Sequence, residues 1–197
     1  MSRLSQRYVF AAPESTAPRT HDLVFYREAL LGPGRYVVEA VGYDAVAGQA
    51  SVRTAEVEVA AVADGRPRMS SLVLVTHADP LAAEDKKGAK PLYFGDTVLY
   101  PGSSGEAFAK SSASGLSFFF TVYGAGPACE ASIEIRRKDL PFKRSTEILP
   151  AADAGGRIQY SGAVPLDSFD VGSYTLRVTV ADGRGSDVRV VPFAVVE

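Results

Sequence analysis

The chain has 197 residues, of which 46% are hydrophobic and 22% are charged, and its net charge is −2 at neutral pH. These proportions are those of an ordinary globular protein with one large or two small domains, and no apolar run approaches the length of a membrane span. Without a basic field, neither nucleic acid nor insertion into a membrane is expected, and no signal peptide is recognisable at the start of the chain.

The first part of the chain, residues 1–62, contains four predicted strands. Two are expected at residues 7–10 and 22–30, and two form a hairpin that follows Gly34. About 60 residues without disulfides bury too little apolar surface to be stable alone. We therefore expect a partial β-sandwich unit that either packs on the rest of the chain or closes a domain whose earlier strands lie upstream in a longer protein.

A turn-rich linker at residues 63–69 leads to a second unit, residues 70–197, with strand signals at the spacing of a sandwich. Residues 79–90 are the one helical candidate, confined to a turn or two by their prolines and glycine. The segment 116–123 is apolar on both faces and predicts a central strand, whereas Ile133 and Ile135 alternate with charged residues and predict a strand with one wet face. The other expected strands are 71–76, 96–100, 131–138, 144–149, 157–164 and a closing hairpin.

The two hairpins repeat one another. Three pairs coincide without gaps: Gly34 with Gly172, Tyr36 with Tyr174, and Asp44 with Asp182. After each tyrosine the residues alternate with period two, which predicts a strand with one buried side. The glycine allows a tight corner between sheets, and the tyrosine hydroxyl can bond back to the upstream backbone, the arrangement known as a tyrosine corner.

At this corner the sequence resembles immunoglobulin-like domains, whose Asp-x-Gly-x-Tyr-x-Cys stretch is matched by Asp170, Gly172 and Tyr174. Leu176 replaces the cysteine, Val38 stands there in the first copy, and the chain has no Trp, so the disulfide and core Trp of antibody domains are absent. The strand signals along the chain predict an all-β fold, and the resemblance implies tandem immunoglobulin-like or fibronectin III-like β-sandwich units, the first of them incomplete.

Longer stretches resemble the C-terminal region of von Willebrand factor A-related proteins of acidobacteria. They are Pro33-Gly-Arg-Tyr-Val-Val-Glu-Ala-Val-Gly-Tyr-Asp-Ala45, Ser70-Ser-Leu-Val-Leu-Val75, Gly115-Leu-Ser-Phe-Phe-Phe-Thr-Val-Tyr123 and Gly156-Arg-Ile-Gln-Tyr160. The resemblance implies a secreted or envelope-associated protein of uncharacterised activity. The metal-binding Asp-x-Ser-x-Ser of A-type domains does not occur in the chain, so no metal residue and no cofactor are carried over.

Two groups of residues are candidates for binding. Tyr93, Phe94 and Tyr100 lie beside a long irregular stretch and could recognise a partner or a carbohydrate, or fold inward to cover the end of the sandwich. Asp182 and Asp187 flank a Gly-Arg-Gly-Ser turn that matches a single copy of a calcium β-roll motif, and could either shape the hairpin turn or bind calcium weakly.

The sequence gives little support for a catalytic site. Cys129 follows Gly-Pro into a strand beside Glu130, which disfavours the thiolate, and we expect it to be a small buried hydrophobe. Gly102-Ser-Ser-Gly105 is not a nucleophile elbow, and His77 with Asp79 is more typical of a solvated loop than of a metal site. The sequence predicts a non-enzymatic spacer or protein-interaction module that contacts other domains of its own protein or another protein. A carbohydrate-binding module attached to a hydrolase is the alternative.

Overall fold

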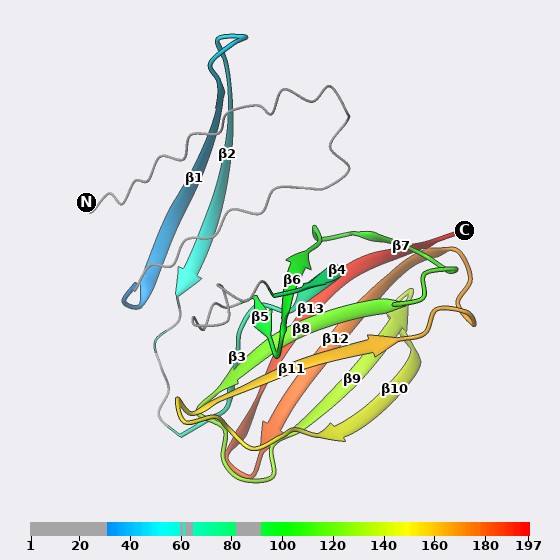
Figure 1. Ribbon diagram of the computed structural model, residues 1–197. Coiled ribbons are helices and arrows are strands. Elements are labelled where there is room, and N and C mark those ends of the chain that lie inside the picture. The colour runs from blue at the N-terminus through cyan, green and yellow to red at the C-terminus, as the bar shows by residue number, and fades with distance from the viewer. Residues whose placement is uncertain (1–30, 60, 62–64, 82–91) are drawn as a thin grey trace. The chain divides into compact units, whose positions relative to one another are not determined.

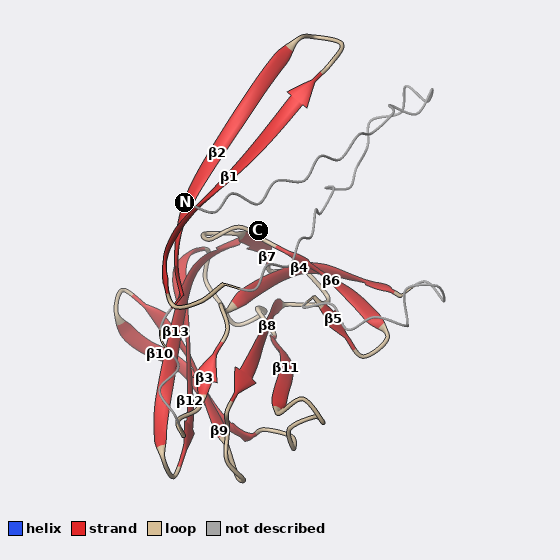
Figure 2. Ribbon diagram, turned by 90° about the vertical axis from the view of Figure 1, so that its left-hand side faces the viewer, coloured by secondary structure: helices blue, strands red, loops and turns tan. Residues whose placement is uncertain are grey.

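The computed structural model describes residues 31–59, 61, 65–81 and 92–197. The strands expected at residues 7–10 and 22–30, and most of the helical candidate 79–90, lie outside the described residues. Every regular element in the described ranges is a β-strand, and the sheets pack as a β-sandwich, which confirms the all-β prediction (Figures 1 and 2). A search of the same ranges finds no helix that could span a membrane.

The first two strands form a long hairpin. β1 (Gly34–Asp44) pairs antiparallel with β2 (Gln49–Val59) over all eleven residues of each strand. The turn is held by Asp44, whose Oδ1 accepts hydrogen bonds from the backbone N–H groups of Val46 and Ala47 at 2.8 and 3.0 Å. Among the described residues no third strand joins this sheet.

The remaining strands form two sheets that enclose one core. One sheet has the order β10-β9-β12-β13-β7 and the other β11-β8-β4-β6-β5, with β3 also paired to β8. The strands are β3 (Arg68–Met69), β4 (Val73–Pro80), β5 (Tyr93–Phe94), β6 (Thr97–Pro101), β7 (Ala107–Ala109), β8 (Leu116–Tyr123), β9 (Glu130–Arg137), β10 (Leu140–Ile148), β11 (Arg157–Val164), β12 (Gly172–Asp182) and β13 (Gly185–Val196).

The central strand β8 has apolar residues on both faces, as its sequence predicts. Phe118 and Phe120 enter the main core between the sheets, while Phe119 points the other way and packs with Val75 and Leu99. In β9, Ile133 and Ile135 are buried and their polar neighbours are not. The apolar positions of β8, β9, β12 and β13 therefore supply most of the core.

Both tyrosine corners are present. The Tyr174 hydroxyl donates to the carbonyl of Asp170 at 2.9 Å, and the Tyr36 hydroxyl donates to the carbonyl of Gly32 at 2.8 Å, each four residues upstream. Gly172, with φ of +147°, makes the bend in a conformation that other residues rarely adopt. The Tyr174 ring is buried against Phe169 and Phe193, with centroid distances of 5.2 and 5.5 Å.

Several strands differ from the sequence prediction. Arg68 and Met69, placed in the linker, form β3, and Met69 is buried in the main core. β4 continues through Asp79 and Pro80, where a helical turn was considered. β10 begins at Leu140 because Lys138 and Asp139, with φ of +49° and +63°, form a two-residue hairpin turn without glycine or asparagine.

Candidate interaction surface

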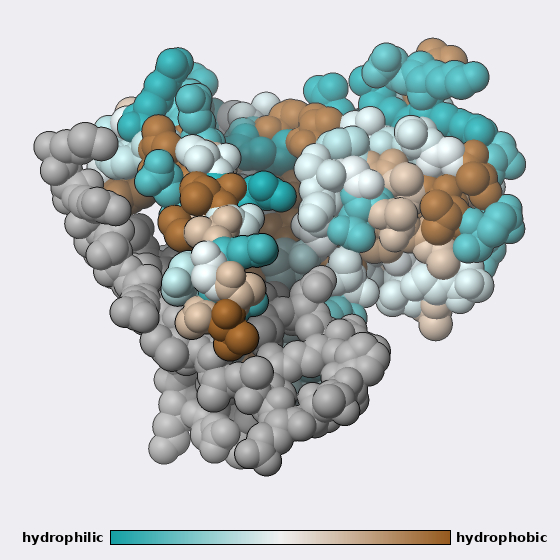
Figure 3. All heavy atoms as spheres, turned by 90° about the horizontal axis from the view of Figure 1, so that it is seen from above, coloured by the Kyte–Doolittle hydropathy of each residue, from teal (hydrophilic) through white to brown (hydrophobic). Residues whose placement is uncertain are grey.

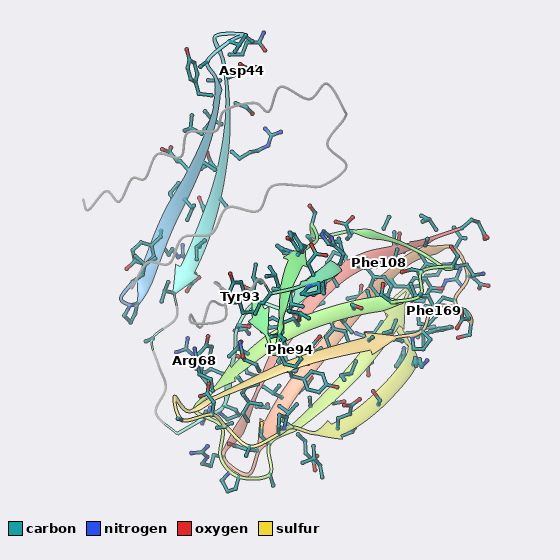
Figure 4. All side chains as sticks on the ribbon, viewed as in Figure 1. Asp44, Arg68, Tyr93, Phe94, Phe108 and Phe169 are labelled. Carbon is teal, nitrogen blue, oxygen red and sulfur yellow. The ribbon has the colours of Figure 1, made fainter. Side chains whose placement is uncertain are left out.

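The three aromatic residues proposed for binding lie on neighbouring strands of one sheet but face different surroundings. Phe94 on β5 packs against the small apolar cluster, edge-on to Phe119 with ring centroids 5.9 Å apart. Tyr93 and Phe94, which Figure 4 labels, are both half-buried. Tyr100 on β6 stacks on His77, with centroids 4.0 Å apart and planes 12° apart. One face of the Tyr100 ring is therefore already occupied, and the carbohydrate-binding alternative stays a prediction.

Asp182, one of the two proposed calcium ligands, lies at the end of β12 in the closing hairpin, and its side chain is buried, with only 1% exposed. Its Oδ2 accepts from the backbone N–H of Gly126 at 2.7 Å and from the Arg184 guanidinium at 2.8 Å, and its Oδ1 accepts from the Arg184 N–H at 2.8 Å. The bonds from Arg184, and then that from Gly126, lower the pKa of Asp182 to about 2. The carboxylate thus ties the β12–β13 turn to the loop between β8 and β9.

Asp187, the other proposed ligand, fastens β3 to β13. Its Oδ2 accepts from the backbone N–H of Met69 at 2.8 Å, and its Oδ1 accepts from Arg189 at 2.7 Å. Arg189 in turn donates to the Met69 carbonyl at 2.8 Å, so both backbone groups of Met69 are bonded from β13. Both aspartates are thus engaged by protein donors, and calcium binding at this turn stays a prediction.

Cys129 was considered for catalysis, and His77 with Asp79 for a second metal site. Cys129 is buried, and its burial, with the negative charge of Asp182 next in importance, raises the pKa of the thiol. His77 packs on Tyr100, and within the described ranges no group of three His, Cys, Asp or Glu residues could hold a metal ion.

The surface that stands out is the β1–β2 hairpin, because it carries hydrophobic side chains that nothing described covers. Val38 and Val57 are 50% and 41% exposed on one face, and Val41 and Val52 are 65% and 53% exposed on the other. Figure 3 shows such hydrophobic side chains uncovered at the surface. The exposed large hydrophobic residues of this hairpin are Val37, Val38, Val41, Tyr43, Val46, Val52 and Val57.

The second hairpin shows how the same motif looks when it is covered. Leu176, at the position of Val38, is fully buried, and Phe193 lies opposite Tyr174 as Val57 lies opposite Tyr36. β12 also pairs along its other edge with β9, whereas β1 has no such neighbour among the described residues. The two hairpins therefore share a corner and a register but differ in burial.

Two polar side chains extend this comparison. Arg53 lies opposite Ala40 as Arg189 lies opposite Val178, and Asp44 stands at the position of Asp182. Arg189 and Asp182 bond to other strands and loops of the sandwich. Within the described part of the chain, Arg53 has no hydrogen bond or ion pair, and only Oδ1 of Asp44 accepts bonds. On the first hairpin, Arg53 and Oδ2 of Asp44 therefore have no partner among the residues that the structure describes.

Comparison with known proteins adds no assignment to these observations. A scan against models of protein families gave no match, and neither did a search of curated proteins.

Proposed function

We propose that this chain is a non-enzymatic β-sandwich spacer and protein-interaction module of an exported or envelope-associated bacterial protein. The resemblance to the region that follows von Willebrand factor A-type domains supports the exported or envelope-associated location. The exposed hydrophobic side chains of the β1–β2 hairpin support the interaction with another domain. The occupant, meaning the segment that covers the apolar faces of the β1–β2 hairpin, is a neighbouring β-sandwich domain of the same protein. β1 and β2 add the closing pair of strands to that domain.

The observation that carries the proposal is the burial of the repeated hairpin. Where β12 and β13 close a sandwich, Tyr174 and Leu176 are buried against the opposite sheet. β9 pairs with the edge of β12 that faces away from β13. An isolated two-stranded hairpin is at best marginally stable in water, so β1 and β2 need comparable neighbours. The occupant supplies an apolar sheet face, a strand edge for β1, a carbonyl for Arg53 and an N–H group for Asp44.

Hydrogen–deuterium exchange on the 197-residue chain tests this proposal, with light scattering on the same sample. We expect a monomer in which the amides of β1 and β2 exchange fast while those of β12 and β13, the matched internal reference, are protected. Equal protection of both hairpins in a monomer would show that the chain already covers this face and would overturn the proposal. Protection together with a dimer would assign the face to a second copy and would overturn the proposed occupant.

A further inference from the structure

A groove crosses the outer face of the five-stranded sheet, on strands that the proposed function does not use. It has a volume of about 300 Å³ and is lined by Pro141 and by polar side chains of β9, β10 and β12. The register sets its floor, because Glu134 of β9 lies directly between Arg144 of β10 and Arg177 of β12. Ser132 and Thr179 form the adjoining row of the lining, and Arg136 lies two residues beyond Glu134.

The groove has more positive charge than its own carboxylate can balance. Three arginines line it with one glutamate. Glu134 is paired with Arg136, whose Nε lies 3.3 Å from Glu134 Oε1. Arg144 donates from Nε to the Ser132 hydroxyl at 3.1 Å, and its two terminal nitrogens have no hydrogen bond or ion pair within the described ranges. Arg177 makes no hydrogen bond or ion pair with the residues that the structure describes.

A guanidinium group holds five N–H donors in a planar fork that matches the oxygen pairs of carboxylate, sulfate and phosphate. Arg144 and Arg177 flank Glu134 from opposite sides, so their free ends can converge on one anion above the sheet. The hydroxyl of Thr179 adds a donor in the same groove. Strands rather than loops carry these side chains, so their spacing is set before a ligand arrives.

We propose that this groove binds an oxyanion group, with Arg144 and Arg177 as its principal donors. The shared chemistry is a tetrahedral or planar anion with two or more oxygens, either as a free inorganic ion or as the acidic group of a sugar. Glu134 opposes this binding by its charge and is held back by Arg136. The site does not depend on the hairpin or on any partner of the hairpin.

Titration of the full chain with sulfate, phosphate and glucuronate, followed by amide chemical shifts at constant ionic strength, tests this proposal. We expect saturable shifts confined to β9, β10 and β12 with at least one of the three anions. The anion that binds most tightly identifies the kind of ligand. Tightest binding of sulfate or phosphate indicates an inorganic oxyanion, and tightest binding of glucuronate indicates an acidic sugar. Shifts that do not saturate, or that lie elsewhere in the chain, would overturn the proposal.

Three variants sharpen the test. Arg177→Gln should weaken binding about tenfold because a charge-assisted pair is lost, whereas Glu134→Gln should tighten binding by removing the opposing charge. Arg35→Gln on the hairpin makes the same change of charge outside the groove and should leave the affinity unchanged. Equal weakening by Arg177→Gln and Arg35→Gln would show that only net charge matters and would reject the site.

Discussion

The hydrogen bond of the tyrosine corner occurs twice in this chain, in two different environments. Tyr36 and Tyr174 each donate to a carbonyl four residues upstream at nearly the same distance. The Tyr174 ring is buried among aromatic rings, and the Arg137 guanidinium lies 5.4 Å from its centroid. The Tyr36 hydroxyl is exposed, so water can replace its bond. The same local geometry therefore contributes differently to stability at the two sites.

Tyr174→Phe tests this difference at one atom. The variant keeps the ring and its packing but leaves the partly buried Asp170 carbonyl without its donor. We expect the free energy of unfolding of the sandwich to fall by about 1 kcal/mol. Denaturant unfolding measures it, with Tyr36→Phe as the matched control that should change stability by much less. Equal effects of the two variants would contradict the role of burial.

At the scale of elements, short segments escaped prediction because their pairing is set by distant residues. β3 has only two residues and no alternation of its own, yet it is held by β8 on one side and by Asp187 and Arg189 on the other. The start of β10 escaped because Lys138 and Asp139 adopt the positive φ values of a tight turn usually made with glycine or asparagine. Longer strands were predictable because their alternation is local.

Asp187→Ala tests the attachment of β3. The substitution removes the acceptor of the Met69 N–H and the ionic partner of Arg189, and we expect unfolding to become easier by about 1–3 kcal/mol. Amide exchange at Met69 should also accelerate relative to that of β8. Asp187→Asn, which keeps one acceptor oxygen, should lie between the wild type and the alanine variant. If Met69 exchange is unchanged in the alanine variant, Asp187 does not hold β3.

At the scale of the whole molecule, alternation and the repeated corner were enough to predict an all-β chain and its closing hairpins. The aromatic cluster was found as a sequence neighbourhood, but which ring turns inward depends on Phe119 and His77, on other strands. The groove of Arg144 and Arg177 could not be predicted at all. Its residues meet only because β9 lies between β10 and β12, and strand order is a non-local property of the sheet.

The acid stability of the whole sandwich depends in part on Asp182, because this carboxylate links the closing turn to the loop before β9. Its folded pKa of about 2 lies below the ordinary value of about 3.9, so the ionised form favours the folded state. This contribution is present above pH ~4 and is lost as the pH falls toward 2.

Asp182→Asn should therefore destabilise the protein at pH 7 and reduce the further loss of stability between pH 5 and pH 2. Some acid sensitivity should persist, because hydrogen bonds from Arg157 and Gly155 also lower the pKa of Asp153. Thermal unfolding across this pH range measures both effects, with Asp167→Asn as a control on an exposed loop that should follow the wild-type profile. An unchanged acid profile in Asp182→Asn would mean that the pKa of Asp182 is not lowered in the folded state, and that its ionisation does not contribute to the acid stability.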